Sequence, residues 1–479
     1  MMRSLYSGVS GLKVHQTKMD VIGNNISNVN TVGFKSSQVN FSDILYQTSS
    51  AASGPNTETG TAGINAKQIG LGANVASITS SMTVSGGSQR TDNALDIMIE
   101  GEQFFIVNNG TQNYFTKAGA FNVDANGILC NSSGCKVMGW QVDPNDPKKC
   151  VADTVSELRV MAPDTMYIEP QGTKNVYFSG NIDYKDSQLQ SDTGKTTTMA
   201  FYDNLGQSYM AIMKLVQSDE AENAYKVKIT DILDSKGDSI FVAKTVEDDG
   251  TVTYNASTIT SFVFGADGDS FTADVDTETG NVNIDMEGVD LIFDAATGHF
   301  TTVGAEEGSK SVLFKVEADP SPFNEITCDF SSMTMYASSG SSTFTSTRGA
   351  LDGSGAGKPQ GNMTGLSVDS YGRIYGSYDN GDTKLLCQIA VASFANAAGL
   401  EAVGNSLFAT TMNSGDFDGV GQDISSSGGK MNTGVLEMSN VDLSTEFTSM
   451  ITTQRGFQAN SRIITTSDTL LEELINLKR

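Results

Sequence analysis

The two ends of the chain share one pattern, and this pattern limits the folds that the chain can adopt. Over residues 4–30 and again over 443–477, apolar residues recur at spacings of three and four, which predicts an amphipathic helix at each end. Between them, turn residues separate short alternating segments that are typical of strands. We therefore expect a nested fold in which the two ends of the chain meet. The apolar stripes that we expect to form the assembly interface are Leu5, Val9, Leu12, Met19, Ile22, Ile26 and Val29 at the first end, and Leu443, Phe447, Met450, Phe457, Ile464 and Leu471 at the second.

The middle of the chain divides by composition. Residues 31–74 are rich in Ser, Thr, Asn and Gly, which predicts an extended connector. Residues 219–294 hold eighteen acids and four bases, which indicates a separate, strongly solvated domain. We expect a mainly β fold with α-helical termini and nested β-domains. The predicted parts are a terminal helical domain at 1–30 and 441–479, a connector at 31–74 and 432–440, a central β-domain at 75–150 and 345–431, and an acidic outer β-domain, as one domain or two, at 151–344.

Neither terminal helix is strong in isolation. Gly8, Gly11 and Gly23 each cost about 0.8–1 kcal/mol relative to Ala in a helix interior, and Gly456 and β-branched residues weaken the second helix. The small residues at 7–11 would permit another helix to approach closely. Three arrangements follow: a coiled-coil hairpin within one chain, helices that become ordered only against other copies, or both together.

Composition excludes several classes of function. The net charge of -26 argues against a nucleic-acid-binding protein, because phosphate binding needs clustered Lys and Arg. With two histidines, His15 and His299, the chain has little material for metal or His-based chemistry, so we expect no catalytic residue, no cofactor and no metal. Polar residues interrupt the most apolar stretch, 385–403, and no membrane insertion is expected. The first residues lack a signal peptide's apolar region, so we expect any export to use a different route.

Three local motifs invite a chemical interpretation that the residues do not support. The loop at 352–359 approaches a phosphate-binding loop, but it lacks the first glycine and the closing Ser or Thr. The acidic run at 267–278 lacks the glycine and closing glutamate of a calcium loop, which favours a solvated surface. Cys130 and Cys135 could form a hairpin disulfide outside the cell or stay as thiols.

Both ends also carry longer motifs. Residues 23–35 read GNNISNVNTVGFK, and residues 434–443 and 454–460 read GVLEMSNVDL and QRGFQAN. These segments resemble the signatures of the bacterial flagellar axial proteins, the family of rod, hook and hook-associated subunits. The signature positions are Asn24, Asn25, Asn28, Gly33, Phe34, Lys35, Ser439, Asn440, Val441, Gln454, Arg455, Ala459 and Asn460.

Parts of the central β-domain are also similar to that family, including residues 118–121 and many positions from 369 to 415. Gln103, Lys117 and Ala397 stand where the resemblance leads us to expect Gly, Arg and Pro. The large insertion at 151–344 resembles that of hook subunits, whereas distal-rod subunits lack one.

The resemblance implies a structural homopolymer in the bacterial flagellum, located in the hook and basal body and extracellular. Its terminal helices would pack as a coiled coil inside a curved tube that transmits torque, with the acidic domain outermost. The implied partners are flagellar rod proteins, hook-filament junction proteins, the hook cap and the flagellar type III export apparatus. The alternatives are a distal rod or hook-filament junction subunit and, from another class, a secreted β-rich adhesin with a ligand-binding acidic domain.

Overall fold

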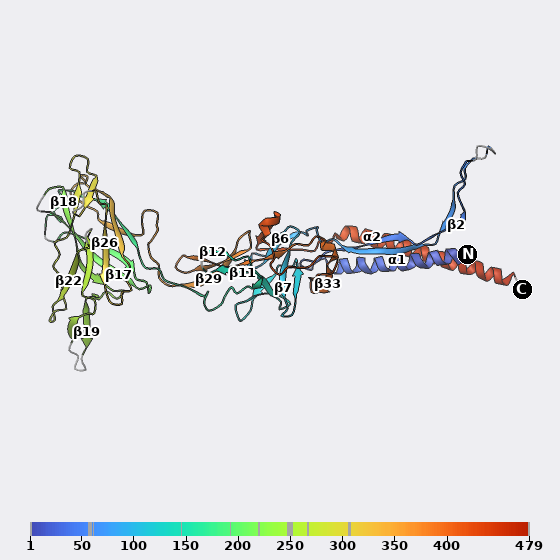
Figure 1. Ribbon diagram of the computed structural model, residues 1–479, viewed down its shortest axis with the longest axis horizontal. Helices are drawn as coiled ribbons and strands as arrows, with labels where there is room; N and C mark the ends of the chain where they lie inside the picture. The colour runs from blue at the N-terminus through green and yellow to red at the C-terminus, as the bar shows by residue number, and fades with distance from the viewer. Residues whose placement is uncertain are drawn as a thin grey trace. The chain divides into compact units, whose positions relative to one another are not determined.

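The chain folds into two compact units (Figure 1). The computed structural model describes residues 2–55, 60, 62–144, 146–191, 193–218, 221–246, 252–265, 268–304 and 308–477. Unit 1 comprises Met1–Met166, Thr364–Ser377 and Thr383–Arg479, and unit 2 comprises Tyr167–Met363 and Tyr378–Asp382. Unit 2 is therefore inserted into unit 1, as the nested pattern predicts.

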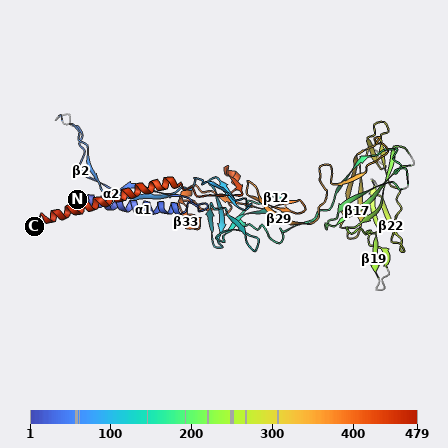
Figure 2. The same ribbon diagram turned by 180° about the vertical axis from the view of Figure 1, so that it is seen from behind.

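Two long helices of unit 1 form an antiparallel pair. α1 (Met2–Ser27) and α2 (Leu443–Asn476) lie side by side, and the start of α1 and the end of α2 lie at the same end of the pair (Figures 1 and 2). Asp442 caps α2, because its side chain accepts hydrogen bonds from the Ser444 amide at 2.9 Å and the Thr445 hydroxyl at 2.8 Å. No described helix has the length and apolar character needed to cross a membrane.

The predicted connector is extended, but it is not a single strand. β1 (Ser37–Asp43) pairs antiparallel with β4 (Ala73–Ser80), and both contact α1. The chain between them forms a ribbon of β2 (Tyr46–Ser50) and β3 (Lys67–Gly70), whose residues are all exposed. Pairing satisfies backbone groups that an isolated extended segment would leave to water.

The rest of unit 1 is built on an antiparallel sheet with the order β30-β31-β11-β7-β8-β34-β33. Phe104, Phe115 and Trp140 are buried in one hydrophobic cluster beside it. The strands and short 3-10 helices are β5 (Ser88–Arg90), β6 (Ile97–Glu100), β7 (Phe104–Asn108), β8 (Asn113–Thr116), β9 (Phe121–Val123), β10 (Leu129–Asn131), β11 (Lys136–Asp143), β12 (Asp146–Cys150), β13 (Ser156–Glu157), β30 (Arg373–Tyr378), β31 (Thr383–Ile389), β32 (Val391–Ala392), η1 (Ala397–Gly399), β33 (Glu401–Gly404), β34 (Leu407–Ala409), η2 (Ile424–Ser427), β35 (Lys430–Thr433) and β36 (Val435–Glu437).

Unit 2 consists mainly of two sheets that share one core. Their orders are β16-β17-β18-β24-β25 and β23-β22-β21-β26-β27-β15-β28, and residues of both, such as Tyr225 and Phe314, join the same buried cluster. A shared core favours one domain. The strands are β14 (Tyr167–Ile168), β15 (Asn175–Asn181), β16 (Lys195–Tyr202), β17 (Ser208–Gln217), β18 (Ala224–Leu233), β19 (Val242–Val246), β20 (Val252–Ala256), β21 (Ser261–Gly265), β22 (Ser270–Val275), β23 (Val282–Ile284), β24 (Val289–Phe293), β25 (Phe300–Val303), β26 (Ser311–Glu317), β27 (Ile326–Thr334) and β28 (Thr345–Arg348). β29 (Gly361–Val368) begins in unit 2 and continues into unit 1, because the boundary falls after Met363.

The boundaries of the inserted unit differ from the expected 151–344. Residues 151–166 lie in unit 1, where Leu158 is fully buried and its amide donates to the Val137 carbonyl at 3.1 Å. At the other end, β28 pairs with β15, so the segment after residue 344 still belongs to unit 2. Strand pairing, which leaves little trace in composition, sets both boundaries.

Candidate assembly interface

The two helices approach each other closely at their glycines. A side chain at Gly8 would meet Ile464 at 3.2 Å, and one at Gly11 would meet the Asn460 amide at 2.7 Å. On α2, a side chain at Gly456 would meet the His15 ring at 2.7 Å. The expected close approach of a second helix is therefore found within one chain, with Asn460 of the family signature in the contact.

The face of α2 that contacts α1 mixes polar and apolar residues. Thr453 and Ser467 are the buried residues of α2, and with the half-buried Asn460 they recur every seven residues along one face. The hydroxyl oxygens of Ser4 and Ser467 lie 3.5 Å apart across the pair. Between these polar positions lie apolar residues that are only half-buried, so the pair uses part of the hydrophobic free energy that α2 offers; they are Met450, Phe457, Ile464 and Leu471.

Many apolar side chains of the helices consequently remain in solvent. Phe447 is 50% exposed and Ile451 is 58% exposed on the first half of α2. Ile463, Leu470 and Leu474, on its second half, are 44–49% exposed. At 3.6 residues per turn, Phe447 and Leu470 point in directions that differ by roughly 140°. The helix pair thus carries two apolar patches that face different ways: patch A, formed by Leu443, Phe447 and Ile451, and patch B, formed by Ile463, Leu470, Leu474 and Leu477.

The predicted stripe residues occupy three environments. Ile22 is buried within the single chain. Val9, Leu443 and Phe447 are exposed. The remaining residues are half-buried along the helix pair and are Leu5, Leu12, Met19, Ile26, Val29, Met450, Phe457, Ile464 and Leu471.

The signature at the end of α1 builds a joint between the helices and the strands. Asn25 is buried, and its side-chain amide donates to the Ser37 carbonyl at 2.9 Å and to a Glu446 carboxylate oxygen at 3.0 Å. Its side-chain oxygen accepts from the Ser37 amide at 3.0 Å. One side chain therefore connects α1, β1 and α2.

A buried ion pair lies at the centre of this joint. The Lys35 ammonium lies 2.7 Å from a carboxylate oxygen of Glu437, and the two side chains are 2% and 0% exposed. The ammonium also donates to the Val84 carbonyl at 2.7 Å, and the same carboxylate oxygen accepts from the Gly86 amide at 3.0 Å. A buried pair needs such additional hydrogen bonds to offset its loss of hydration.

Two further signature residues complete the joint. The Asn440 side chain accepts from the Ser36 amide at 2.7 Å and donates to the Ser81 carbonyl at 3.0 Å. Gly33 has φ +68°, and a side chain there would lie 2.6 Å from the Ala118 backbone nitrogen. Both the positive φ and the close approach require glycine.

The other signature positions are placed less centrally. Asn28 donates to the Asn24 carbonyl at 3.0 Å and ends α1 with a hydrogen-bonded turn. Ser439 is buried, and Phe34 and Val441 are half-buried at the joint. The remaining signature residues are Gln454, Arg455 and Ala459, which are exposed on α2 and do not reach the joint.

Sequence reasoning did not assign a role to Glu437, the partner of Lys35. A signal was present, because Glu437 is a single acid within an apolar strand, where an uncompensated charge is costly. It also noted Lys117 only as a departure from the family pattern, whereas the residue is 1% exposed. Its ammonium donates to the Gly101 carbonyl at 2.7 Å, and burial lowers the pKa of Lys117 to about 8.

The three local motifs show no chemical site among the described residues. The loop at 352–359 leads into a strand, β29, rather than the helix of a phosphate-binding loop. No group of three or more potential metal ligands occurs in the described part of the chain, and Asp267 lies outside it. Cys130 and Cys135 are free thiols rather than a disulfide.

Family comparisons agree with this architecture from end to end. Models described as "Flagella basal body rod protein" and "Flagellar basal body rod FlgEFG protein C-terminal" match residues 5–35 and 432–477. The "Flagellar hook protein FlgE/F/G D1 domain" matches residues 98–176, and the "Flagellar basal body protein FlaE D2 domain" matches 175–350. The helical ends and the two β regions define an axial structural protein of the flagellar rod and hook.

Relatives place the chain within that class. It is 36% identical to the flagellar hook protein FlgE of Borreliella burgdorferi and 35% identical to that of Treponema pallidum, with 100% of each chain covered in both comparisons. A solved structure of Helicobacter pylori flagellar hook protein FlgE2 matches with 12% identity and a TM-score of 0.35, covering 73% of this chain and all of that one. The chain belongs to the flagellar hook protein family. It is a structural subunit of the hook, not an enzyme, and forms a homopolymer in the flagellum.

Proposed function

We propose that patches A and B of the terminal helices carry the assembly of hook subunits into a curved, flexible tube that transmits torque. On this proposal the helices lie inside the tube and unit 2 lies outermost. The tube joins the flagellar rod to the hook-filament junction proteins, grows beneath the hook cap, and receives subunits through the flagellar type III export apparatus. The observation that carries the proposal is that α2 keeps an apolar surface exposed after α1 has packed against it.

Energetics support this role for the patches. Fully burying a side chain such as Leu or Phe stabilises by about 1.5–3 kcal/mol, and the patch residues retain roughly half of that potential. Patches A and B point in different directions, so one copy can contact two neighbours at once. A contact between unlike patches repeats without closing, which generates a helical polymer rather than a dimer.

The joint supports the transmission of torque. The hydrogen bonds of Asn25, Lys35 and Asn440 connect the helices to the strands of unit 1 through buried polar contacts. Buried polar networks restrict the geometry of their members, and in this one each named group except one carboxylate oxygen of Glu437 has a partner among the described residues. A rotation imposed on the helices would therefore reach the β-sheet of unit 1, and flexing would fall on contacts between copies.

A charge placed in patch A tests the proposal. Phe447→Asp should abolish tubes in electron micrographs of the concentrated protein, because burial of an unpaired carboxylate opposes assembly. The single chain should remain folded, since Phe447 is half exposed in it. Phe457→Asp is less informative, because Phe457 also packs along the helix pair.

Thr452→Asp is the matched control, because Thr452 is exposed on α2 but belongs to neither patch. This variant should form tubes like those of the unmodified protein. Circular dichroism and Trp140 fluorescence would verify that both variants fold. Normal tubes from Phe447→Asp would contradict the assignment of patch A to assembly.

A further inference from the structure

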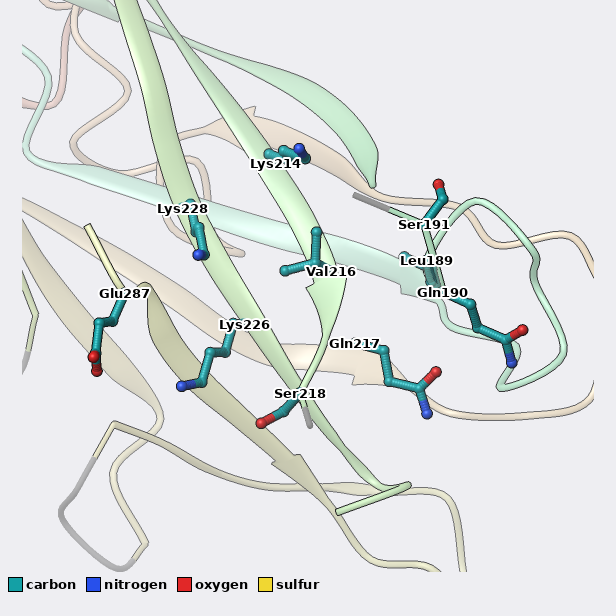
Figure 3. Close-up of a pocket in the computed structure, with 10 residues that line it drawn as sticks. All are labelled: Leu189, Gln190, Ser191, Lys214, Val216, Gln217, Ser218, Lys226, Lys228 and Glu287. Carbon is teal, nitrogen blue, oxygen red and sulfur yellow. The ribbon is translucent and has the colours of Figure 1, made fainter. Parts of the chain in front are cut away.

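Unit 2 has a hollow lined by lysines on the outer face of one sheet. Lys214 projects from β17, and Lys226 and Lys228 project from the adjacent β18, at the edge of a cavity of about 650 Å³ (Figure 3). Their neighbours Leu215, Val227 and Ile229 alternate with them and are buried in the core. The lysines are therefore fixed on the solvent face by the alternation of the strands.

This arrangement of like charges is unfavourable in a single chain. Lys214 and Lys228 are direct partners across the two strands, where like charges repel. Among the described residues, the nearby acids are Glu287 at the rim and Asp290, which lies opposite Lys226 on β24. In the same described part of the chain, none forms an ion pair with Lys226 or Lys228. These two ammonium groups are therefore available to a carboxylate from outside the chain.

The position of these lysines within the sequence is itself unusual. Of the four bases among the twenty-two charged residues of 219–294, two are Lys226 and Lys228. The opposite charge is concentrated in another part of the same unit. Asp274, Asp276 and Glu278, at the end of β22 and in the turn before β23, are all exposed, and no Lys or Arg occurs from 245 to 309.

We infer that the lysine-lined hollow of one hook subunit docks the acidic β22-β23 turn of a second copy of the chain. β23 lies at the end of its sheet, so this turn is accessible. The two surfaces differ, so the contact is head-to-tail and can repeat along a row of subunits. It rests on the proposed assembly of the tube and adds a specific contact between the inserted units.

Such a contact would be adjustable rather than rigid. Solvent-exposed ion pairs are weak individually and are screened over about 8–10 Å at physiological ionic strength. Long lysine side chains can exchange between neighbouring carboxylates as the distance between subunits changes. Rows of these contacts would thus hold the outer units together while permitting them to slide.

Cross-linking between isotopically different copies tests the inference. Tubes assembled from an equal mixture of ¹⁴N- and ¹⁵N-labelled full-length protein would be treated with a carbodiimide, which joins an amine directly to a carboxylate. Mass spectrometry should find mixed ¹⁴N/¹⁵N peptides that join Lys226 or Lys228 to the segment 274–278. The double variant Lys226→Glu/Lys228→Glu should lose the cross-links between these surfaces and form tubes of altered curvature. Adding Asp274→Lys and Glu278→Lys to it should restore the curvature, and it leaves Asp276, whose side chain holds the turn through Thr279, unchanged.

The double variant Lys236→Glu/Lys310→Glu is the matched control, because it changes the same charge at exposed lysines outside the hollow. It should keep the cross-links and the curvature. Cross-links within single copies only, or an unchanged curvature in Lys226→Glu/Lys228→Glu, would overturn the inference. Protection of the lysines by added dextran sulfate without any link between copies would also overturn it in favour of an outside polyanion. A failure of the proposed function would look different, because Phe447→Asp would then form normal tubes while the cross-links between the lysines and the segment 274–278 were kept.

Discussion

Replacing Lys35 by Met should destabilise unit 1 by about 3–5 kcal/mol, because it leaves a buried carboxylate without its counter-charge. Met has a similar length and fills the same space, so the change in packing is small. The main loss is the 2.7 Å contact between the Lys35 ammonium and Glu437, in a place where both side chains are almost fully buried.

The structure explains why the loss is large but bounded. After the substitution, one carboxylate oxygen of Glu437 keeps the Gly86 amide at 3.0 Å, but the other has no hydrogen-bond partner among the described residues. The Val84 carbonyl keeps a 3.2 Å bond from Asn440. These remaining hydrogen bonds limit the total cost.

Fluorescence can measure the effect in unit 1 specifically, because the single tryptophan, Trp140, lies in its buried cluster. Urea unfolding followed by this signal should shift to lower midpoints without a change in slope. Hydrogen exchange at the Gly33 and Gly86 amides would detect opening of the joint if it separates from the rest of the unit.

Two variants make the result interpretable. Lys35→Met/Glu437→Gln should recover much of the lost stability, because no buried charge remains and the Gln oxygen can still accept from Gly86. Lys430→Met removes an exposed pair with Glu100, whose side chains are 60% and 53% exposed, and should cost less than about 1 kcal/mol. A loss below about 1 kcal/mol for Lys35→Met would refute the reasoning.

Three further changes test other parts of unit 1. Gly33→Ala should lower the free energy of unfolding in urea by roughly 3 kcal/mol or more, whereas Gly110→Ala should lower it by about 1 kcal/mol. Both glycines have a positive φ, but only Gly33 lies against backbone atoms. Equal losses in the two variants would contradict this prediction. Burial lowers the pKa of Lys117 to about 8, so between about pH 8 and pH 10.5 the unfolded chain binds more protons than the folded chain. The free energy of unfolding of the unmodified protein, relative to that of Lys117→Met, should therefore rise by about 3 kcal/mol over that pH range. A difference that stays constant with pH would contradict this prediction. Burial also lowers the pKa of His15 below 6.5, so the stability of the protein should fall as the pH drops through about 6.5. In thermal unfolding followed by circular dichroism, His15→Gln should make stability less dependent on pH. The same dependence of stability on pH in both proteins would disprove the role of His15.

Sequence patterns predicted the order of the elements better than their limits. The helical spacing identified both terminal helices within a few residues, because each keeps an apolar stripe over many turns. The strand composition of the middle was also evident. The limits of unit 2 were displaced at both ends, since β13 and β28 are short strands whose membership depends on distant pairing partners rather than on local composition.

The stripes were a less complete guide to the interface. The spacing of α2 predicted one apolar face. The structure divides it, because Leu443 and Phe447 are exposed whereas the later stripe residues are half-buried beside the polar Thr453, Asn460 and Ser467. A helical pattern states which residues share a face and does not state which face the partner helix takes. The glycines indicate which face of α1 contacts α2, because α2 approaches closely at Gly8 and Gly11.

The polarity of Thr453 and Ser467 has a consequence for assembly. If Thr453 and Ser467 were large apolar residues, the helix pair would gain its stability within one chain and would have less to gain from neighbours. The small polar residues at these positions instead limit the hydrophobic free energy gained within one chain, and Phe447 and the rest of patches A and B remain exposed to solvent. On the proposed function, α1 and α2 of a single chain therefore stay paired, and the apolar side chains that they leave exposed favour polymerisation. The apolar surface that a monomer leaves exposed then becomes the surface that holds the tube together.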